Sequence, residues 1–107
     1  MENNSESVRV CPVSIFTEKL GGKWKSEIIY HLRNKTLRFG QLAAIINGVS
    51  RKVLTDHLKQ MEKDNLVFRK SYNETPPRVE YSLSPAAKDL EPLFEKLGAW
   101  VQKHYLV

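Results

Sequence analysis

The feature that most limits how this chain can fold is the short break from Asn47 to Ser50, which separates two segments with helical spacing of apolar residues. The apolar positions are Leu42, Ile45 and Ile46 before the break and Leu54, Leu58 and Met61 after it. Gly48 readily adopts the left-handed conformation that ends a helix, and Ser50 is a favoured N-cap for the next one. The sequence therefore predicts a helix-turn-helix over residues 38–63.

A hairpin pattern follows the second of these helices. Asn65 ends that helix, residues 66–71 are predicted to form a strand with Phe68 in the core, and residues 79–83 form its partner. The intervening segment YNETPPR, residues 72–78, is too rich in Asn and Pro to extend either strand. A helix-turn-helix followed by a hairpin over residues 66–83 predicts a winged helix-turn-helix, which is an α+β fold that is mainly helical.

Two helices and a brief strand are predicted ahead of this motif. The first helix begins at Pro12, because proline is favoured at the first helical position, and it ends at Gly21. Residues 23–32 predict a core helix in which Trp24 is a packing anchor, and residues 37–39 predict a brief strand. A length of 107 residues fits a single domain, so we expect residues 1–107 to form one unit.

The last helix is predicted to run unbroken from Pro85 almost to the C-terminus, with Ser84 as its N-cap. Its wide apolar band exceeds what so small a domain, with two core helices and a sheet to bury, can cover. Such a surface is unusual on a monomer, so a homodimer that uses residues 85–107 is predicted. The alternative is a helix that lies wholly on its own domain. The predicted interface residues are Val13, Phe16, Leu90, Leu93, Phe94, Leu97, Trp100 and Val101.

The positive charge of the chain is concentrated in its middle. The net charge is +5, and the segment from Lys23 to Glu80 has twelve Lys and Arg residues against six Asp and Glu residues. The middle therefore carries +6 and the two ends together −1. This distribution is typical of a surface that faces a polyanion, although a solvated surface rich in lysine is the alternative.

The predicted second helix of the motif carries a polar stripe opposite its apolar face. Lys52, Thr55, Asp56 and Lys59 stand at intervals that place them on one side of the helix. In a DNA-binding helix-turn-helix, the first half of this helix enters the major groove, where Arg or Lys can bond guanine and Thr can contact a thymine methyl group. Asp56 would accept from cytosine or orient a neighbouring cation, and Lys59 suits a phosphate. The predicted reading residues are Ser50, Arg51, Lys52, Thr55, Asp56 and Lys59.

The loop and its flanks supply a second set of polar residues. They offer charge and hydrogen-bond donors to a phosphate backbone or to the minor groove, and Pro76 and Pro77 stiffen the tip. A surface hairpin whose charges only maintain solubility is the alternative. The predicted wing and backbone contacts are Arg38, Lys70, Tyr72, Asn73, Thr75 and Arg78.

Other functional classes find little support in the sequence. No metal-ligand pattern, phosphate-binding loop or nucleophile motif is present, so we expect no enzymatic activity, no metal and no cofactor. No segment has the length and apolarity of a membrane span or a signal peptide, so a cytoplasmic location is expected. An RNA-binding or protein-interaction winged-helix module with a structural Cys11 stays open as the alternative, although Tyr72 is the only plausible stacking platform in the basic stretch.

Several short stretches, in this order and spacing, resemble the HxlR-type winged helix-turn-helix regulators of bacteria over nearly the whole chain. The stretches are Cys11-Pro12, Gly22-Lys23-Trp24, Arg38-Phe39-Gly40-Gln41-Leu42, Gly48-Val49-Ser50 with Leu54-Thr55, Leu58 and Glu62, and Pro76 through Leu83. The resemblance implies a dimeric transcriptional regulator that binds double-stranded DNA, and we expect it to be a repressor. It further implies that the first and last helices, residues 8–20 and 85–107, build the dimer, and such a dimer would bind an operator with inverted half-sites.

Cys11 is the only cysteine of the chain. Similar regulators carry a cysteine at this place, and in some of them it senses oxidants or electrophiles. A position just before a helix start, with Arg9 nearby, lowers the pKa of a thiol, whereas a lone cysteine is also often an inert small hydrophobe. Without a second cysteine, a sensor here is limited to alkylation, a mixed disulfide or a bridge to the partner subunit.

Overall fold

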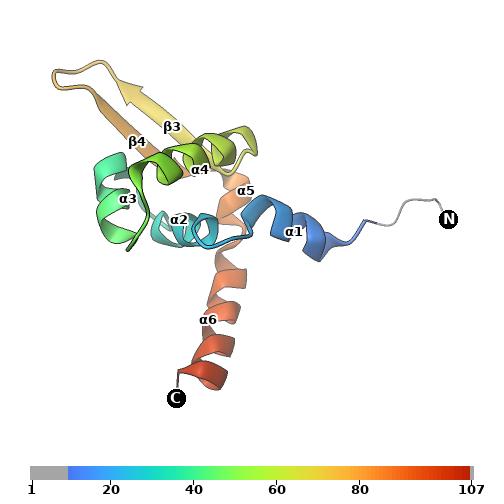
Figure 1. Cartoon of the computed structure of the whole chain (residues 1–107). Helices are drawn as coiled ribbons and strands as arrows, with labels where there is room; N and C mark the ends of the chain where they lie inside the picture. Colours follow the sequence, from blue (N-terminus) through green and yellow to red (C-terminus); the bar gives the residue numbers. More distant parts are fainter. Residues whose placement is uncertain (1–9, 107) are drawn as a thin grey trace.

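The computed structural model describes residues 10–106 and has the architecture of a winged helix (Figure 1). The elements are α1 (Pro12–Leu20), α2 (Lys25–His31), β2 (Leu37–Arg38), α3 (Phe39–Ile45), α4 (Arg51–Lys63), β3 (Val67–Tyr72), β4 (Arg78–Leu83), α5 (Pro85–Lys88) and α6 (Glu91–Tyr105). Helices α3 and α4 form the helix-turn-helix, and the β3–β4 hairpin projects beyond them as the wing. The predicted fold class is thereby confirmed.

The core lies between α2, α3, α4 and the inner face of the sheet. Ile28 and Ile29 of α2 are fully buried, as are Leu54 and Met61 of α4. Trp24 is partly buried against this core, which confirms it as a packing anchor. The apolar spacing of each segment thus orients the helix, and the polar face of α4 is left toward solvent.

Four polar or flexible residues fix the ends of these helices. Gly48 has φ +89° and Asn65 has φ +59°, the left-handed conformation that ends a helix. The Ser50 hydroxyl accepts a hydrogen bond from the backbone N–H of Val53 at 3.0 Å, which caps α4 as predicted. The buried Ser84 caps α5 and donates to the Asn65 carbonyl at 2.7 Å. The start of α5 is therefore bonded to the end of α4.

The sheet has three antiparallel strands in the order β2-β4-β3. Tyr72 pairs with Arg78 at the tip end of the hairpin, and Val67 pairs with Leu83 at its base. On the other side of β4, Arg38 pairs with Glu80. The brief strand expected at residues 37–39 therefore joins the hairpin, but Phe39 begins α3 instead of ending the strand.

Two residues predicted to be buried are exposed. Phe68 is 50% exposed, because neighbouring strand residues face opposite sides and Val67 takes the inward position. Ile45 is 42% exposed, since Leu42 of the short α3 and Ile46, the residue after its end, occupy the inward side. Both corrections follow from which residue of an adjacent pair faces the core.

The last helix is also not a single element, because α5 ends at Lys88 and α6 starts at Glu91. Pro92 has no N–H to donate to the carbonyl of Lys88, which would be its partner in a continuous helix. Proline near a helix start is favoured, so α6 begins anew there.

Helix α6 projects away from the rest of the molecule (Figure 1) and has no buried residue. The radius of gyration is 16.5 Å, against about 13 Å for a compact chain of about 100 residues. Among residues 10–106, no helix has both the length and the apolarity needed to cross a membrane.

Candidate nucleic-acid interface

The N-terminal half of α4 presents its cations to solvent. Leu54 and Leu58 fill the core on the opposite side of the helix, so Arg51, Lys52 and Lys59 face outward. The Ser50 cap holds the first turn of this helix in place. The same helical spacing therefore determines that the leucines are buried and that the cations are exposed.

Arg51 and Lys52 each have a neighbour that restrains them. The Arg51 guanidinium lies over the Phe39 ring, 4.7 Å from its centre, so a residue of α3 supports the first residue of α4. Lys52 forms an ion pair with Asp56 at 3.0 Å, and both side chains are exposed. Two roles were predicted for Asp56, and the ion pair with Lys52 agrees with the second, the orientation of a neighbouring cation. The pair is weak by itself, so Lys52 stays available to another anion.

A hollow of about 330 Å³ lies between α4 and the hairpin, lined by Thr55, Lys59, Glu62, Arg69 and Tyr81. It brings two of the predicted α4 residues together with Arg69, which the sequence reasoning missed. Strand alternation identifies Arg69, because Val67 faces the core and the residue two positions later shares its side of the strand. Arg69 therefore extends the cationic surface from α4 toward the wing.

At the tip end of the wing, Arg78 is held by three neighbours. Its guanidinium contacts Glu74 at 3.0 Å and Glu80 at 3.6 Å, and it lies 3.8 Å from the centre of the Tyr72 ring. The buried Nε of Arg78 has no hydrogen-bond partner within residues 10–106. Arg78 thus shapes the wing, because two carboxylates already balance its charge.

The other predicted wing residues remain open to solvent. Lys70, Asn73 and Thr75 are exposed, and the Lys70 ammonium lies 5.0 Å from the centre of the Tyr72 ring. Arg38 lines a hollow of about 280 Å³ with Arg78, where α3 begins beside the wing. Its backbone N–H donates to the Gln41 side chain at 2.8 Å, which caps α3. The geometry therefore brings α3, α4 and the wing onto one cationic surface.

Cys11 is exposed and occupies the N-cap position of α1. Polar groups of the first helical turn lower the pKa of the thiol, the backbone and hydroxyl of Ser14 first and the backbone of Val13 next. Arg9, which the sequence also placed near this thiol, lies outside the described residues. The thiolate is thus stabilised by the first turn of the helix.

An apolar surface covers α1 and α6 on the side away from the wing. Val13 and Phe16 of α1 are exposed, and in α6 Leu93, Leu97 and Trp100 are each about half exposed. Leu90 and Phe94 differ, because both are partly buried against the core of their own domain. A shallow apolar groove of about 220 Å³ connects the two helices through Phe16, Leu90, Leu93, Phe94 and Leu97.

These features define a helix-turn-helix transcriptional regulator with a wing. The HxlR-like helix-turn-helix family matches residues 19–106, and the chain belongs to that family. The HTH-type transcriptional regulator YdeP of Bacillus subtilis is 32% identical over 104 residues, which are 97% of this chain and 81% of YdeP. These relatives are transcriptional regulators and not enzymes.

Solved structures of two similar proteins agree with this assignment. The crystal structure of the HTH-type regulator ytcD has a TM-score of 0.86 and 35% identity, covering 92% of this chain and all of that one. The oxidized form of the redox regulator HypR has a TM-score of 0.81 and 34% identity, covering 88% of this chain and 97% of that one. The chain is therefore a DNA-binding regulator of the HxlR family.

Proposed function

We propose that this protein is a homodimeric repressor that binds double-stranded DNA of defined sequence, with α4 in the major groove and the wing on the phosphate backbone. The observation that carries the proposal is the exposed cationic first half of α4, which is backed by a fully packed core. A helix entering the groove by its N-terminal half places Arg51, Lys52 and Thr55 nearest the base edges.

The remaining polar residues divide between the groove and the backbone. Arg51 and Lys52 suit guanine edges, Thr55 suits a thymine methyl group, and Ser50 caps the helix that carries them. The phosphate contacts fall to the more distant residues, which fix the orientation of the protein without reading sequence. These are Arg38, Lys59, Arg69, Lys70, Asn73 and Thr75, with Tyr72 and Arg78 shaping the wing.

The dimer is supported by the apolar surface of α1 and α6. Helix α6 projects with half-exposed Leu97 and Trp100, a surface that burial against a second copy would stabilise. A two-fold dimer presents two copies of α4, so the operator has inverted half-sites. Their centres lie about 34 to 36 Å apart, or a multiple of that distance.

We further propose that Cys11 makes the regulator responsive to oxidants or electrophiles. The thiol is exposed and its pKa is lowered by the first turn of α1, which favours the reactive thiolate. The similarity to the redox regulator HypR supports the same role. A modification at Cys11 would act beside the proposed dimer surface, because Val13 and Phe16 belong to the same helix.

The central test is selection of binding sites from a random duplex pool with the full-length protein. We expect an enriched inverted repeat, and footprinting of the DNA beside the protein's own coding region should protect a related sequence. An enriched single half-site, or no enriched sequence at all, contradicts the proposal. Repression is tested by placing the selected site in a reporter promoter, where added protein should lower transcription.

The Cys11 role is tested by repeating the footprint after treatment with diamide or a quinone. Treatment should change the protection given by the parent protein and leave that of Cys11→Ser unchanged. An unchanged footprint for the treated parent contradicts the sensor role while the DNA-binding proposal stands.

A further inference from the structure

The hollow between α4 and the hairpin is lined from two sides by residues that the fold turns toward each other. On α4, Thr55, Lys59 and Glu62 stand at i, i+4 and i+7, so they share one side of the helix. On the sheet, Arg69 of β3 pairs with Tyr81 of β4, and paired residues of antiparallel strands face the same side. Polar side chains of the helix and of the sheet therefore meet in one space of about 330 Å³.

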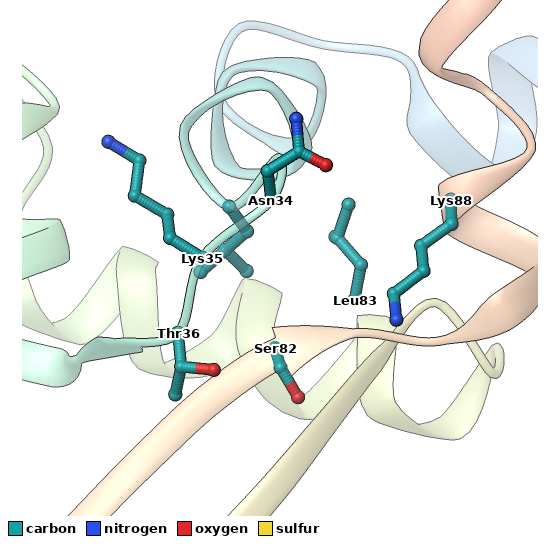
Figure 2. Close-up of a pocket in the computed structure, with 7 residues that line it drawn as sticks. Asn34, Lys35, Thr36, Ser82, Leu83 and Lys88 are labelled. Carbon is teal, nitrogen blue, oxygen red and sulfur yellow. The ribbon is translucent and has the colours of Figure 1, made fainter.

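Strand alternation turns Tyr81 toward α4. Figure 2 shows the Ser82 and Leu83 side chains on opposite sides of β4. Leu83 is buried in the core, and Tyr81, two residues earlier on the same strand, points to the same side. The Tyr81 ring therefore packs in the core, and the residue also lines the hollow.

The Tyr81 hydroxyl is a hydrogen-bonding group without a protein partner. The residue is only 8% exposed, yet within residues 10–106 its hydroxyl forms no hydrogen bond. The hydroxyl oxygen is also not enclosed, because in this part of the chain Nε of Arg78 is the one buried side-chain atom that lacks a partner. The hydroxyl of a buried tyrosine usually has a partner. Here the hollow is the place from which a ligand can supply one.

The charge of the hollow matches a ligand with one negative charge. Lys59 and Arg69 contribute two positive charges and Glu62 one negative charge, which leaves a net charge of +1. Within residues 10–106, neither Lys59 nor Arg69 forms an ion pair. Each phosphate group of DNA carries one negative charge, and its oxygens accept hydrogen bonds from guanidinium, ammonium and hydroxyl groups.

We propose that this hollow binds one phosphate group of the DNA strand that passes between α4 and the wing. Arg69 and Lys59 balance its charge. The hydroxyl groups of Tyr81 and Thr55 donate to its oxygens, and the Thr55 methyl group stays available to a base. The inference rests on the proposed placement of α4 in the major groove, which a phosphate strand borders on each side. A phosphate bound from both α4 and β3 would fix the wing relative to the reading helix.

The experiment measures binding of the full-length protein to the selected operator and to a scrambled duplex by fluorescence anisotropy. Tyr81→Phe keeps the ring and removes the hydroxyl, so it should weaken binding to both duplexes about tenfold. The salt dependence should stay the same, because the phosphate keeps its cations. Arg69→Gln should instead lower the slope of log K against log salt by about 1. Tyr30→Phe, at an exposed tyrosine of α2, should bind like the parent.

A matched pair of variants separates the two groups of the Thr55 side chain. Thr55→Val keeps the shape and removes the hydroxyl, so both duplexes should bind more weakly by a similar factor. Thr55→Ser keeps the hydroxyl and removes the methyl group, so it should affect the operator preference instead. Urea denaturation should give Tyr81→Phe the stability of the parent, because the Tyr81 hydroxyl has no partner within residues 10–106 of the free protein.

Two results would overturn this inference and leave the proposed function in place. In the first, the parent selects an operator, but Tyr81→Phe and Thr55→Val bind both duplexes as the parent does. In the second, inorganic phosphate that replaces chloride at equal ionic strength releases DNA from the parent and not from Arg69→Gln, so the hollow takes a free anion. Conversely, a parent that selects no sequence, with a Tyr81→Phe variant that binds every duplex more weakly, supports the phosphate site and contradicts sequence reading.

Discussion

The winged-helix body and helix α6 expose opposite kinds of surface. The body buries Leu54 and Leu58 completely and leaves Arg51 and Lys52 in water, whereas α6 has no fully buried residue and leaves Leu97 about half exposed. Exposed charge is stable in a monomer because water solvates it. An exposed apolar surface is different, because covering it lowers the free energy of the protein. The body therefore packs its own apolar residues, whereas the apolar surface of α6 is the part that the proposed dimer would cover.

The largest expected effect comes from placing a charge on α6. Leu97→Glu should leave an uncompensated carboxylate in the proposed dimer interface and weaken the dimer by about 3 to 5 kcal/mol. Sedimentation velocity should show a monomer with an unchanged far-ultraviolet circular dichroism spectrum. Glu95→Lys, on the same helix, is the control for charge change alone. A parent protein that is already monomeric at high concentration contradicts this prediction.

The next effect tests the body. Leu54→Ala removes a side chain that is fully buried, so it should lower the free energy of unfolding by about 2 to 5 kcal/mol. Urea denaturation at a fixed protein concentration measures the change. The same truncation at Leu93, which is 53% exposed in α6, should affect the sedimentation of the dimer more than the melting of the body. Equal unfolding losses at both sites would erase the distinction between the two regions.

A smaller effect is expected at the reading surface. Arg51→Ala should weaken binding to the selected operator by about 1 to 3 kcal/mol and relax the preference at one base pair. Fluorescence anisotropy with operator and scrambled duplexes measures both quantities. Lys63→Ala removes a charge from the other end of α4 and should change operator affinity less. A loss that is equal on both duplexes would mean that Arg51 does not read a base.

The contrast between the regions also explains how far the sequence could be interpreted. Spacing of Leu42, Leu54 and Leu58 predicts the helix-turn-helix, because a packed helix must present one apolar face, and Gly48 and Ser50 mark the turn. The break before α6 was missed, although Pro92 carries the signal for it. Phe68 was misplaced because an adjacent pair of apolar strand residues does not reveal which one faces inward.

The surface was harder to predict than the core. Spacing placed Lys52 and Asp56 on one stripe, and they do form a pair, because both belong to the same helix. The hollow that joins Arg69 to α4 depends on how the hairpin packs against that helix. This packing cannot be predicted from the spacing of residues within either element. The two carboxylates that hold Arg78 depend likewise on strand register and loop shape.

A wing contact should differ from a reading contact in kind. Lys70→Ala should lower affinity for operator and scrambled duplexes alike, because a phosphate contact carries no sequence information. The slope of log K against log salt should fall by about 1. Titrations at several salt concentrations measure the slope, with Arg51→Ala as the comparison that changes sequence preference. An unchanged slope would remove Lys70 from the phosphate contacts.

The smallest effect is expected at the thiol, beside the α1 part of the apolar surface. Ser14 lowers the pKa of Cys11 through its backbone and through its hydroxyl. Ser14→Ala removes the hydroxyl and keeps the backbone, so it should raise the pKa of Cys11 partway toward the ordinary value. The thiolate would then form at higher pH, and alkylation by iodoacetamide should slow near neutral pH while reaching the same rate in alkali. Rates measured from roughly pH 6 to 10 give the midpoint. Ser14→Thr keeps the hydroxyl and should keep the parent midpoint. If Ser14→Ala also keeps it, the backbone of the first turn alone activates Cys11, and the thiol owes its reactivity to the helix start that also sets out Val13 and Phe16.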